Sequence, residues 1–368
     1  MSYARPNIER MHGYVPGEQP KVPGLIKLNT NENPYPPSPK VFEALRAAVD
    51  GRLRLYPDPQ SLGLRQKLGA RFGFDPAQIL IGNGCDDILN LCVRAFVGEG
   101  ETLAYFWPSY SLYPVLADIQ GAKKIELPLN DKFQIQSVPS LAGVKLLFIT
   151  QPNAPSGVWL DKQTLRNISG TFDGIVVVDE AYVDFASDNC LDFVGQYPNV
   201  LVARSFSKSS ALAGMRLGWI VGPPALIGAL DKVKDSYNVS RLSQIAGEAA
   251  VEDVPYFEEI VRKVKATRQR VVGRLEEWKF SVYPSATNFV FAKPPSPLTA
   301  KQWFDSLRER KVLVRWWDAD RIRDFARVSI GTDEEMDRFL DQTAVILSEA
   351  KNLSRSPANN RDPSLRSG

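Results

Sequence analysis

Lys208 stands in a setting that a surface lysine does not need. The stretch SFSKSSALAGMRLGW places Lys208 between small hydroxyl residues and puts Arg216 eight residues after it. The hydroxyls of Ser205 and Ser207 can donate hydrogen bonds to an anion, and an arginine can direct two N–H donors at one phosphate. These residue types favour a lysine that binds a phosphorylated ligand.

A carboxylate and a phenol follow a second apolar run. In GIVVVDEAYVDF, Asp179 and Glu180 come at the carboxyl end of a predicted buried strand, and Tyr182 follows shortly after. Ligands of open α/β sheets bind at the carboxyl ends of the strands. Asp179 is therefore a candidate partner for a cationic ring nitrogen, with Tyr182 beside it. The alternative is that Asp179 caps the next turn.

A glycine-rich turn supplies a third feature. In LIGNGCDDILNL, a predicted strand ends at Gly82 and Gly84, and a predicted helix begins at once. Asp87 occupies the position of the last glycine in G-x-G-x-x-G, so this dinucleotide-binding pattern is only half matched. Free N–H groups at a helix N-terminus nevertheless form a seat for phosphate. For this segment alone, an ordinary strand–helix turn is the alternative.

The three features together match the needs of one cofactor. Pyridoxal phosphate needs a lysine for its aldehyde, a carboxylate for its protonated ring nitrogen, a donor for its phenolic oxygen and a phosphate cup. The chain places these parts at successive predicted strand ends. Each part alone is common, but their combination predicts a site for pyridoxal phosphate.

Residue counts exclude several other chemistries. His12 is the only histidine, which excludes a Ser-His-Asp triad and metal sites built from several histidines. The three cysteines, Cys85, Cys92 and Cys190, have no CxxC spacing and predict no disulfide framework and no metal centre. Acid–base work must therefore be done by lysine, tyrosine, aspartate or glutamate.

Composition is that of an ordinary soluble globular protein. Of 368 residues, 44% are hydrophobic and 24% are charged. The net charge of +3 arises after residue 350, so the rest of the chain gives no case for nucleic-acid binding. No apolar run reaches transmembrane length, and the first residues have no signal-peptide pattern. We expect a cytoplasmic protein without a membrane or nucleic-acid partner.

Hydrophobic runs predict an α/β fold with a second, smaller unit. Short β-branched runs, typical of strands buried on both faces, alternate with helical segments such as 85–97 and predict a mostly parallel sheet. These runs span residues 78–82, 101–106, 123–129, 144–150, 174–179, 199–205 and 216–222. From about residue 225 the pattern changes to long charged helices, 258–280 and 299–310, with a few strands. This change predicts a smaller α+β domain.

The motifs resemble those of fold-type-I aminotransferases, specifically the histidinol-phosphate aminotransferase family. SFSKSSALAGMRLGW is similar to that family's cofactor-lysine motif, and further matches occur in family order over roughly residues 10–348. These further matches are KLNTNENPYPP, LYPDPQSLGLRQKL, GNGCDDILNLCVRAF, FWPSYSLYPVLA, QPNAPSG, VVVDEAYVDF and ARVSIGT. We expect an N-terminal arm (1–30), a large cofactor-binding domain (31–240), a small C-terminal domain (241–350) and a disordered tail (351–368).

The resemblance implies a role for each matched cofactor residue. Lys208 would bind the cofactor's aldehyde and move a proton, Asp179 would keep the ring nitrogen protonated, and Tyr182 would bind the phenolic oxygen. Tyr110 would stack on the ring, and Tyr56 would reach the phosphate bound in the neighbouring subunit. The remaining phosphate contacts would come from the N–H groups of Gly84, Cys85 and Asp86 and from Ser205, Ser207 and Arg216.

The resemblance also implies a set of substrate-binding residues. Arg327, in ARVSIGT, would receive the substrate's anionic group, and Asn31 would belong to the same set. Arg315 and Tyr14 are candidates for the substrate phosphate, with Tyr14 supplied by the partner chain. The alternatives are a solvated charge at a strand end for Arg315 and a packing role for Tyr14.

One loop departs from the family pattern. The family's P-N-N-P-T-G is here Pro152-Asn153-Ala154-Pro155-Ser156-Gly157, so the second asparagine, which contacts the phenolic oxygen, is replaced by Ala154. Either Asn153 takes over this contact or Tyr182 makes it alone. We expect Asn153 to lie in the site.

The expected activity is a ping-pong amino transfer between histidinol phosphate and 2-oxoglutarate, in histidine biosynthesis, by a homodimer with shared sites. An aromatic amino-acid aminotransferase and a threonine-phosphate decarboxylase are alternatives within the same fold. A non-catalytic binding protein that keeps the fold is an alternative of another class. The presence of Lys208, Asp179 and Arg216 argues against it.

Overall fold

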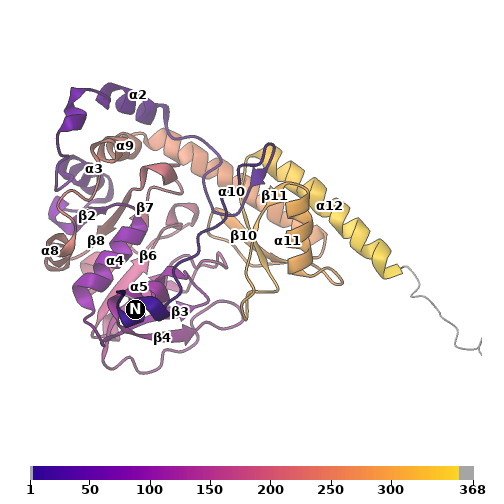
Figure 1. The fold of residues 1–368 in the computed structure, drawn as a ribbon, viewed down its shortest axis with the longest axis horizontal. Coiled ribbons are helices and arrows are strands. Elements are labelled where there is room, and N and C mark those ends of the chain that lie inside the picture. The colour runs from indigo at the N-terminus through magenta and orange to yellow at the C-terminus, as the bar shows by residue number, and fades with distance from the viewer. Residues whose placement is uncertain (1–2, 356–368) are drawn as a thin grey trace, which may run out of the picture.

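The computed structural model describes residues 3–355 and contains a seven-stranded sheet in the order β2-β8-β7-β6-β5-β3-β4 (Figure 1). All neighbouring pairs from β4 to β7 are parallel, whereas β8 is antiparallel to both β7 and β2. The prediction of a mostly parallel α/β sheet is confirmed. The strands are β2 (Ile79–Gly82), β3 (Thr102–Trp107), β4 (Lys123–Pro128), β5 (Val144–Thr150), β6 (Ile175–Asp179), β7 (Val200–Ser205) and β8 (Gly218–Val221).

Helices cover both faces of this sheet, which is why its strands are apolar at nearly every position. Along β6, Val176 and Val178 belong to one hydrophobic core, while Val177 belongs to a second core on the opposite face. The associated helices are α2 (Pro39–Ala48), α3 (Leu62–Phe72), α4 (Cys85–Phe96), α5 (Leu112–Gln120), α6 (Lys162–Thr171), α7 (Phe193–Gln196), α8 (Pro224–Val233) and α9 (Arg241–Glu252). Short 3₁₀ turns occur at Gly51–Arg54, Pro76–Gln78, Val183–Phe185 and Ala213–Met215.

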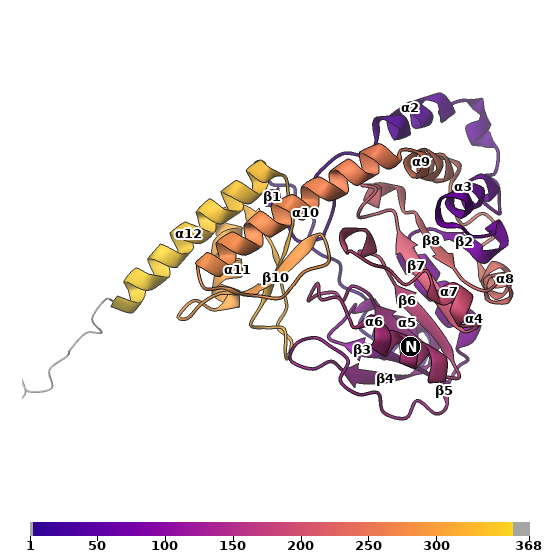
Figure 2. The ribbon, with the colours of Figure 1, turned by 180° about the vertical axis from the view of Figure 1, so that it is seen from behind.

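A second, antiparallel sheet has the order β12-β13-β10-β9 and a third hydrophobic core. Its strands are β9 (Ser281–Val282), β10 (Phe289–Lys293), β12 (Arg315–Trp316) and β13 (Ala326–Ser329), and its helices are α10 (Val254–Glu277), α11 (Ala300–Glu309) and α12 (Asp333–Arg355). Figure 2 shows β10 of this sheet with α10, α11 and α12 in the same part of the molecule. Because α12 continues to Arg355, residues 351–355, which were predicted to belong to the disordered tail, are helical. The rest of that tail lies outside the described residues. Within the described residues, no helix is long and apolar enough to cross a membrane.

The N-terminal arm connects the two sheets. Its short helix α1 (Pro6–Arg10) lies against α5, where the Asn7 side-chain amide donates to the carbonyl of Asp118 at 2.7 Å. Further along, Glu18 forms an ion pair with Arg308 on α11 at 2.6 Å. The strand β1 (Ile26–Lys27) then pairs in parallel with β11 (Val312–Leu313). The arm is therefore attached to both parts of the molecule.

Candidate active site

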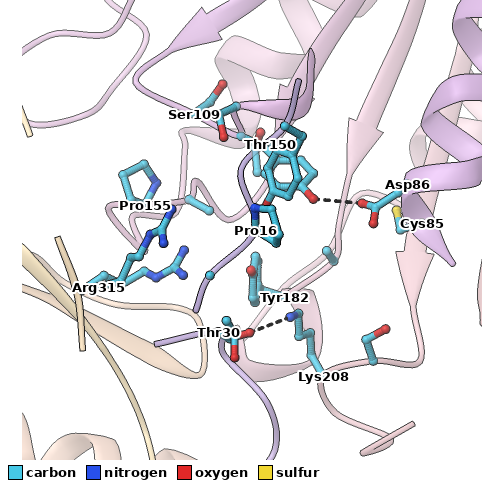
Figure 3. Close-up of a pocket in the computed structure, with 18 of the residues that line it drawn as sticks. Pro16, Thr30, Cys85, Asp86, Ser109, Thr150, Pro155, Tyr182, Lys208 and Arg315 are labelled. Carbon is cyan, nitrogen blue, oxygen red and sulfur yellow. Dashed lines mark hydrogen bonds between the residues drawn. The ribbon is translucent and has the colours of Figure 1, made fainter. Parts of the chain in front are cut away.

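A cavity of about 310 Å³ lies between the carboxyl ends of the large sheet's strands, the second sheet and the N-terminal arm (Figure 3). The strand ends contribute because side chains that follow a parallel strand project beyond the sheet edge. The cavity is lined by twelve of the residues predicted for the site: Tyr14, Cys85, Asp86, Tyr110, Asp179, Tyr182, Ser205, Ser207, Lys208, Arg216, Arg315 and Arg327. The structure thus brings the predicted cofactor and substrate residues to one place.

Asp179 ends β6 and is buried at the bottom of this cavity. Burial raises the pKa of its carboxyl group to about 6, although hydrogen bonds from Tyr113 and from the Ala181 N–H act in the opposite direction. The Tyr113 hydroxyl donates to Oδ2 at 2.8 Å, and the Ala181 N–H donates to Oδ1 at 3.1 Å. A cation placed against this carboxyl would favour its ionised form and gain binding energy from it.

Tyr113 is a site residue that sequence reasoning missed. Its ring is completely buried and stacks on Phe148 with ring centroids 4.6 Å apart, and its hydroxyl also hydrogen-bonds Thr150 at 2.8 Å. This packing fixes the orientation of the Tyr113 hydroxyl that donates to Asp179. The Tyr113 ring also packs edge-on against Tyr110, with ring centroids 5.8 Å apart, although Tyr110 precedes α5.

Lys208 is held by the segment that follows β1. Its Nζ donates to the carbonyl of Thr30 at 3.3 Å and lies 5.5 Å from the centroid of the Tyr182 ring (Figure 3). The side-chain amide of Asn33 donates to the Lys208 carbonyl at 2.9 Å. Both ends of the lysine, its main chain and its amine, are therefore positioned by residues 30–33.

Asn31 belongs to the same segment but does not line the cavity. Its amide nitrogen donates to the Tyr182 hydroxyl at 3.0 Å, and its Oδ1 accepts a hydrogen bond from Ser329 at 2.8 Å. Asn31 thus connects Tyr182 with β13 of the second sheet. Its predicted role in binding substrate stays a prediction.

The predicted phosphate seat is built at the start of α4. Gly84 caps this helix with φ of 90°, and a Cβ at Gly84 would lie 2.6 Å from Nη2 of Arg216. Only glycine combines this backbone conformation with so close an approach. Arg216 itself has the left-handed φ of 48° and forms an ion pair with Asp86 at 3.2 Å. The helix N-terminus and the guanidinium therefore converge, as an anion site requires.

Two tyrosines, Tyr110 and Tyr14, line the cavity next to this phosphate seat. The Tyr110 hydroxyl donates to Oδ1 of Asp86 at 2.9 Å, and burial raises the pKa of Tyr110, so its phenol stays neutral. Tyr14 packs its ring edge-on against Tyr110 with centroids 5.7 Å apart. Tyr14 lines the cavity of its own chain, where the arm is held by the docking of α1 on α5. A contribution of Tyr14 from a partner chain stays a prediction.

Arg315 and Arg327 face each other on β12 and β13. Arg327 donates from Nη2 to the carbonyl of Asn29 at 3.0 Å, and its buried Nε has no hydrogen-bond partner. Burial lowers the pKa of Arg327, and the charge of Arg315 acts in the same direction. Within the described residues, neither arginine forms an ion pair with a carboxylate. Two such groups in a cavity form a site for an anion.

Besides Asn31, three predicted residues do not line the cavity: Gly84, Asn153 and Tyr56. Gly84 lies just beneath the seat, as described above. Asn153 is buried, its amide donates to the Pro108 carbonyl at 3.0 Å, and its Oδ1 accepts from Ser156 at 2.6 Å. The cavity is lined by Ala154 instead, so the structure does not bring Asn153 to the site.

Tyr56 is 78% exposed and stacks on Tyr237 with ring centroids 4.3 Å apart. It does not line its own chain's cavity, and its predicted contact with a neighbouring subunit stays a prediction.

The residues present fit pyridoxal phosphate. Asp179 is a buried carboxyl group with a raised pKa, Lys208 lies on the cavity wall, and the seat at Gly84 leaves no room for a Cβ. Lys208 would hold the aldehyde, Asp179 the ring nitrogen, and the α4 N-terminus together with Arg216 the phosphate. Tyr110 and Tyr182 also line the cavity, where they can contact the ring.

Comparison with known proteins agrees with this geometry. The family model for aminotransferase class I and II matches residues 23–342. A histidinol-phosphate aminotransferase from a Geobacter species is 47% identical over 335 residues, which cover 91% of this chain and 95% of that protein. A histidinol-phosphate aminotransferase from Syntrophotalea carbinolica is 46% identical, over 94% of this chain and 100% of that protein.

A solved structure of similar fold is the histidinol-phosphate aminotransferase from Sinorhizobium meliloti in complex with pyridoxal-5'-phosphate. Its TM-score is 0.84 with 26% identity, and the match covers 95% of this chain and 98% of that one. The fold, the site and these similarities agree, and the chain belongs to the aminotransferase class I and II family and, within it, to the histidinol-phosphate aminotransferases.

Proposed function

We propose that this protein uses pyridoxal phosphate to transfer the amino group of histidinol phosphate to 2-oxoglutarate, a step of histidine biosynthesis. The observation that carries the proposal is the pair Arg315 and Arg327, which faces the same cavity as Lys208 and Asp179. A reactive lysine and a site for a second anion thus share one cavity. The names of the curated relatives support the same substrate.

The cofactor end of the cavity performs the chemistry. When bound, pyridoxal phosphate supplies an electron-withdrawing ring that acidifies the α-hydrogen of an amine attached to it. Tyr113 keeps the Asp179 carboxyl in place. Asp179 would hold a proton on the ring nitrogen, and Tyr182 would donate to the phenolic oxygen. With Ala154 in the loop and Asn153 bonded elsewhere, Tyr182 makes this last contact without help from that loop.

Lys208 moves the proton. Its Nζ lies in the cavity between Thr30 and Tyr182 (Figure 3). With the cofactor bound, the amine form of Nζ would accept the proton from the substrate's α-carbon and would donate it to the cofactor carbon that had carried the aldehyde. The hydrogen bonds to Thr30 and Asn33 limit how far the lysine can move between these two positions.

The arginine end of the cavity orients the substrates. A phosphate monoester and the distal carboxylate of 2-oxoglutarate are both anions, so Arg327 and Arg315 can bind each in turn. One site for two successive reactants requires that the first product leaves before the second substrate binds, as in a ping-pong sequence.

We further propose that the protein is a cytoplasmic homodimer. Tyr56 is exposed together with its neighbours Leu53 and Leu55, which supports an interface at this surface, where Tyr56 would reach the partner's phosphate seat. The three buried, unpaired cysteines are compatible with a reducing compartment.

Steady-state turnover with three donors tests the proposal. Purified, cofactor-loaded enzyme is given 2-oxoglutarate and either histidinol phosphate, phenylalanine or threonine phosphate, and glutamate and carbon dioxide are measured. We expect glutamate formation with histidinol phosphate at a kcat/KM at least about tenfold above that with phenylalanine. The phosphate of histidinol phosphate can contact both arginines, whereas the carboxylate of phenylalanine needs only one, and one additional contact of this kind accounts for a factor of about ten. Release of carbon dioxide from threonine phosphate, or a preference for phenylalanine, would reject the proposed substrate.

A further inference from the structure

The positions of Arg315 and Arg327 in the cavity are electrostatically unfavourable for the folded chain. Arg315 and Arg327 are direct cross-strand partners of β12 and β13, and like charges in this position repel each other. Within the described residues no carboxylate pairs with either of them, and Arg327 is half-buried, with its Nε shielded from solvent and without a hydrogen-bond partner. Something other than an acidic side chain must hold both guanidinium groups in the cavity.

Trp317 is the residue that both arginines share. The guanidinium carbon of Arg315 lies over the Trp317 ring at 5.2 Å from its centroid, and that of Arg327 lies over the same ring at 5.0 Å. Arg327 also lies over the Phe289 ring at 5.2 Å. Distances within about 6 Å give a favourable cation–π interaction, strongest for tryptophan and stronger where water is excluded.

The Trp317 ring is itself fixed in place. Trp317 follows β12, lines the cavity and packs against the hydrophobic core of the large sheet. Its neighbour Trp316 has a different environment, with its ring near Phe304 of α11 and its Nε1 donating to the Arg323 carbonyl at 2.7 Å. Trp316 does not line the cavity. The chain thus offers two adjacent tryptophans, of which only Trp317 contacts the arginine pair.

We propose that Trp317 determines the preference for a phosphate monoester over a carboxylate, because it holds two guanidinium groups ready for one dianion. This inference rests on the proposed function and names the residue behind its substrate preference. A guanidinium over a ring face keeps its N–H edge free for hydrogen bonds. A carboxylate has two oxygens, which one such edge can fill, whereas a phosphate group has three terminal oxygens and can use both edges.

The surroundings of Arg327 explain why the preference depends on the ring. Desolvation and the neighbouring charge of Arg315 disfavour the positive charge of Arg327, and a bound dianion offsets this penalty more fully than a monoanion does. Without the Trp317 ring, one guanidinium is free to turn away, and the remaining arginine still serves a carboxylate. Phosphate binding therefore loses more than carboxylate binding when Trp317 is replaced.

The experiment compares Trp317→Leu, Trp317→Phe and the matched control Trp316→Leu, each as cofactor-loaded enzyme. The conversion of bound cofactor to its amine form is followed with histidinol phosphate and with phenylalanine as donors. Inorganic phosphate is then tested as a competitor of phenylalanine. Thermal unfolding of each variant reports whether the fold is intact.

We expect Trp317→Leu to raise the KM for histidinol phosphate and the inhibition constant for inorganic phosphate by about tenfold or more, the effect of losing two cation–π contacts. The KM for phenylalanine should rise by no more than about threefold, and kcat should change little. Trp317→Phe, which keeps an aromatic face, should restore most of the phosphate affinity, and Trp316→Leu should match the wild type. An equal loss for both donors, or the same loss in Trp316→Leu, would overturn the inference.

The inference and the proposed function fail in different ways. If the wild type prefers another phosphorylated amine, the proposed substrate is wrong, while the Trp317 effect on phosphate persists. If the wild type uses histidinol phosphate but Trp317→Leu leaves phosphate competition unchanged, the function stands and the role of Trp317 is rejected. If phosphate does not compete in the wild type at all, there is no dianion site for Trp317 to organise.

Discussion

At the scale of single residues, the carboxyl group of Asp179 controls the affinity of the site for its cofactor. The sequence predicted Asp179 because it ends an apolar run, and the end of a buried strand is where ligands of such sheets bind. It did not predict Tyr113, since the partner of a buried carboxylate depends on packing between β6 and α5. Asn153 illustrates the same limit, because its amide donates to the carbonyl of Pro108, which follows β3, and its Oδ1 accepts from Ser156 of its own loop.

The pH dependence of cofactor affinity follows from Asp179. Burial raises the pKa of Asp179 to about 6 in the absence of a cation, and a cationic ring nitrogen favours the ionised form. Affinity should therefore be full above pH 6 and fall below it by up to about tenfold per pH unit, as the free carboxyl takes up a proton. The measurement is the dissociation constant of pyridoxal phosphate from pH 5 to 8. Asp179→Asn should bind more weakly and lack this part of the pH dependence. An identical pH profile in this variant would contradict the assignment.

Replacing Tyr113 by phenylalanine should shift this profile. The Tyr113 hydrogen bond lowers the pKa of Asp179, so Tyr113→Phe should move the loss of affinity to higher pH. A hydrogen bond to a charged group contributes about 1.5–3 kcal/mol, which predicts roughly tenfold weaker cofactor binding or more at pH 7. Tyr105→Phe is the matched control, because Tyr105 is also buried but its hydroxyl donates to Glu126. An unchanged profile in Tyr113→Phe would show that the hydroxyl does not act on Asp179.

At the scale of elements, the start of α4 and the N-terminal arm position the site. The glycine-rich turn was predicted from the sequence because glycines and a following helix are local features. The course of the arm was not, because its contacts join residues far apart in the chain, such as Glu18 with Arg308 and β1 with β11. The position of Tyr14 in its own chain's cavity follows from these contacts, and its predicted role in a partner chain's site stays a prediction.

The turn at Gly84 provides an element-scale prediction. A Cβ at Gly84 would lie 2.6 Å from Arg216, and the φ of 90° disfavours any side chain there. Gly84→Ala should therefore displace Arg216 and weaken pyridoxal phosphate binding by about tenfold or more, since each lost 1.4 kcal/mol is a factor of ten. The control is Gly228→Ala in α8, where a Cβ meets no atom within 4 Å. This control should keep its affinity and gain up to about 1 kcal/mol of stability. Normal cofactor affinity in Gly84→Ala would contradict the proposed phosphate seat.

At the scale of the whole molecule, the sequence predicted the layered α/β part well and the pairing of distant strands poorly. Runs such as 144–150 and 174–179 became β5 and β6 almost residue for residue, because β-branched residues bounded by turns are local signals. The antiparallel placement of β8 between β2 and β7 depends on contacts across the sheet and was not predicted. The boundary at residues 240 and 241 stays a prediction. The helix that follows it, α9, packs against α2 and α3.

Dimerisation is the prediction at this scale. The proposed interface contains Tyr56, which is exposed and lies outside its own chain's cavity. Sedimentation should show a dimer of the 41.0 kDa chain in both the wild type and Tyr56→Phe. Tyr56→Phe should lose about threefold to tenfold in cofactor affinity, because one hydroxyl contact to a phosphate is removed. A fully active monomer would contradict the shared site, and unchanged affinity in Tyr56→Phe would remove this tyrosine from it.

The central claim is that Lys208 moves the proton in an amino transfer from histidinol phosphate. The most direct measurement is one half-reaction, in which the absorbance of cofactor-loaded enzyme is followed after histidinol phosphate is added to the wild type and to Lys208→Ala. The wild type should convert its cofactor fully and saturably to the amine form. Lys208→Ala should still retain cofactor through the seat at Gly84 and Arg216 but convert it at least about a thousandfold more slowly, the scale of a lost acid–base catalyst. Conversion at the wild-type rate in Lys208→Ala would contradict the account.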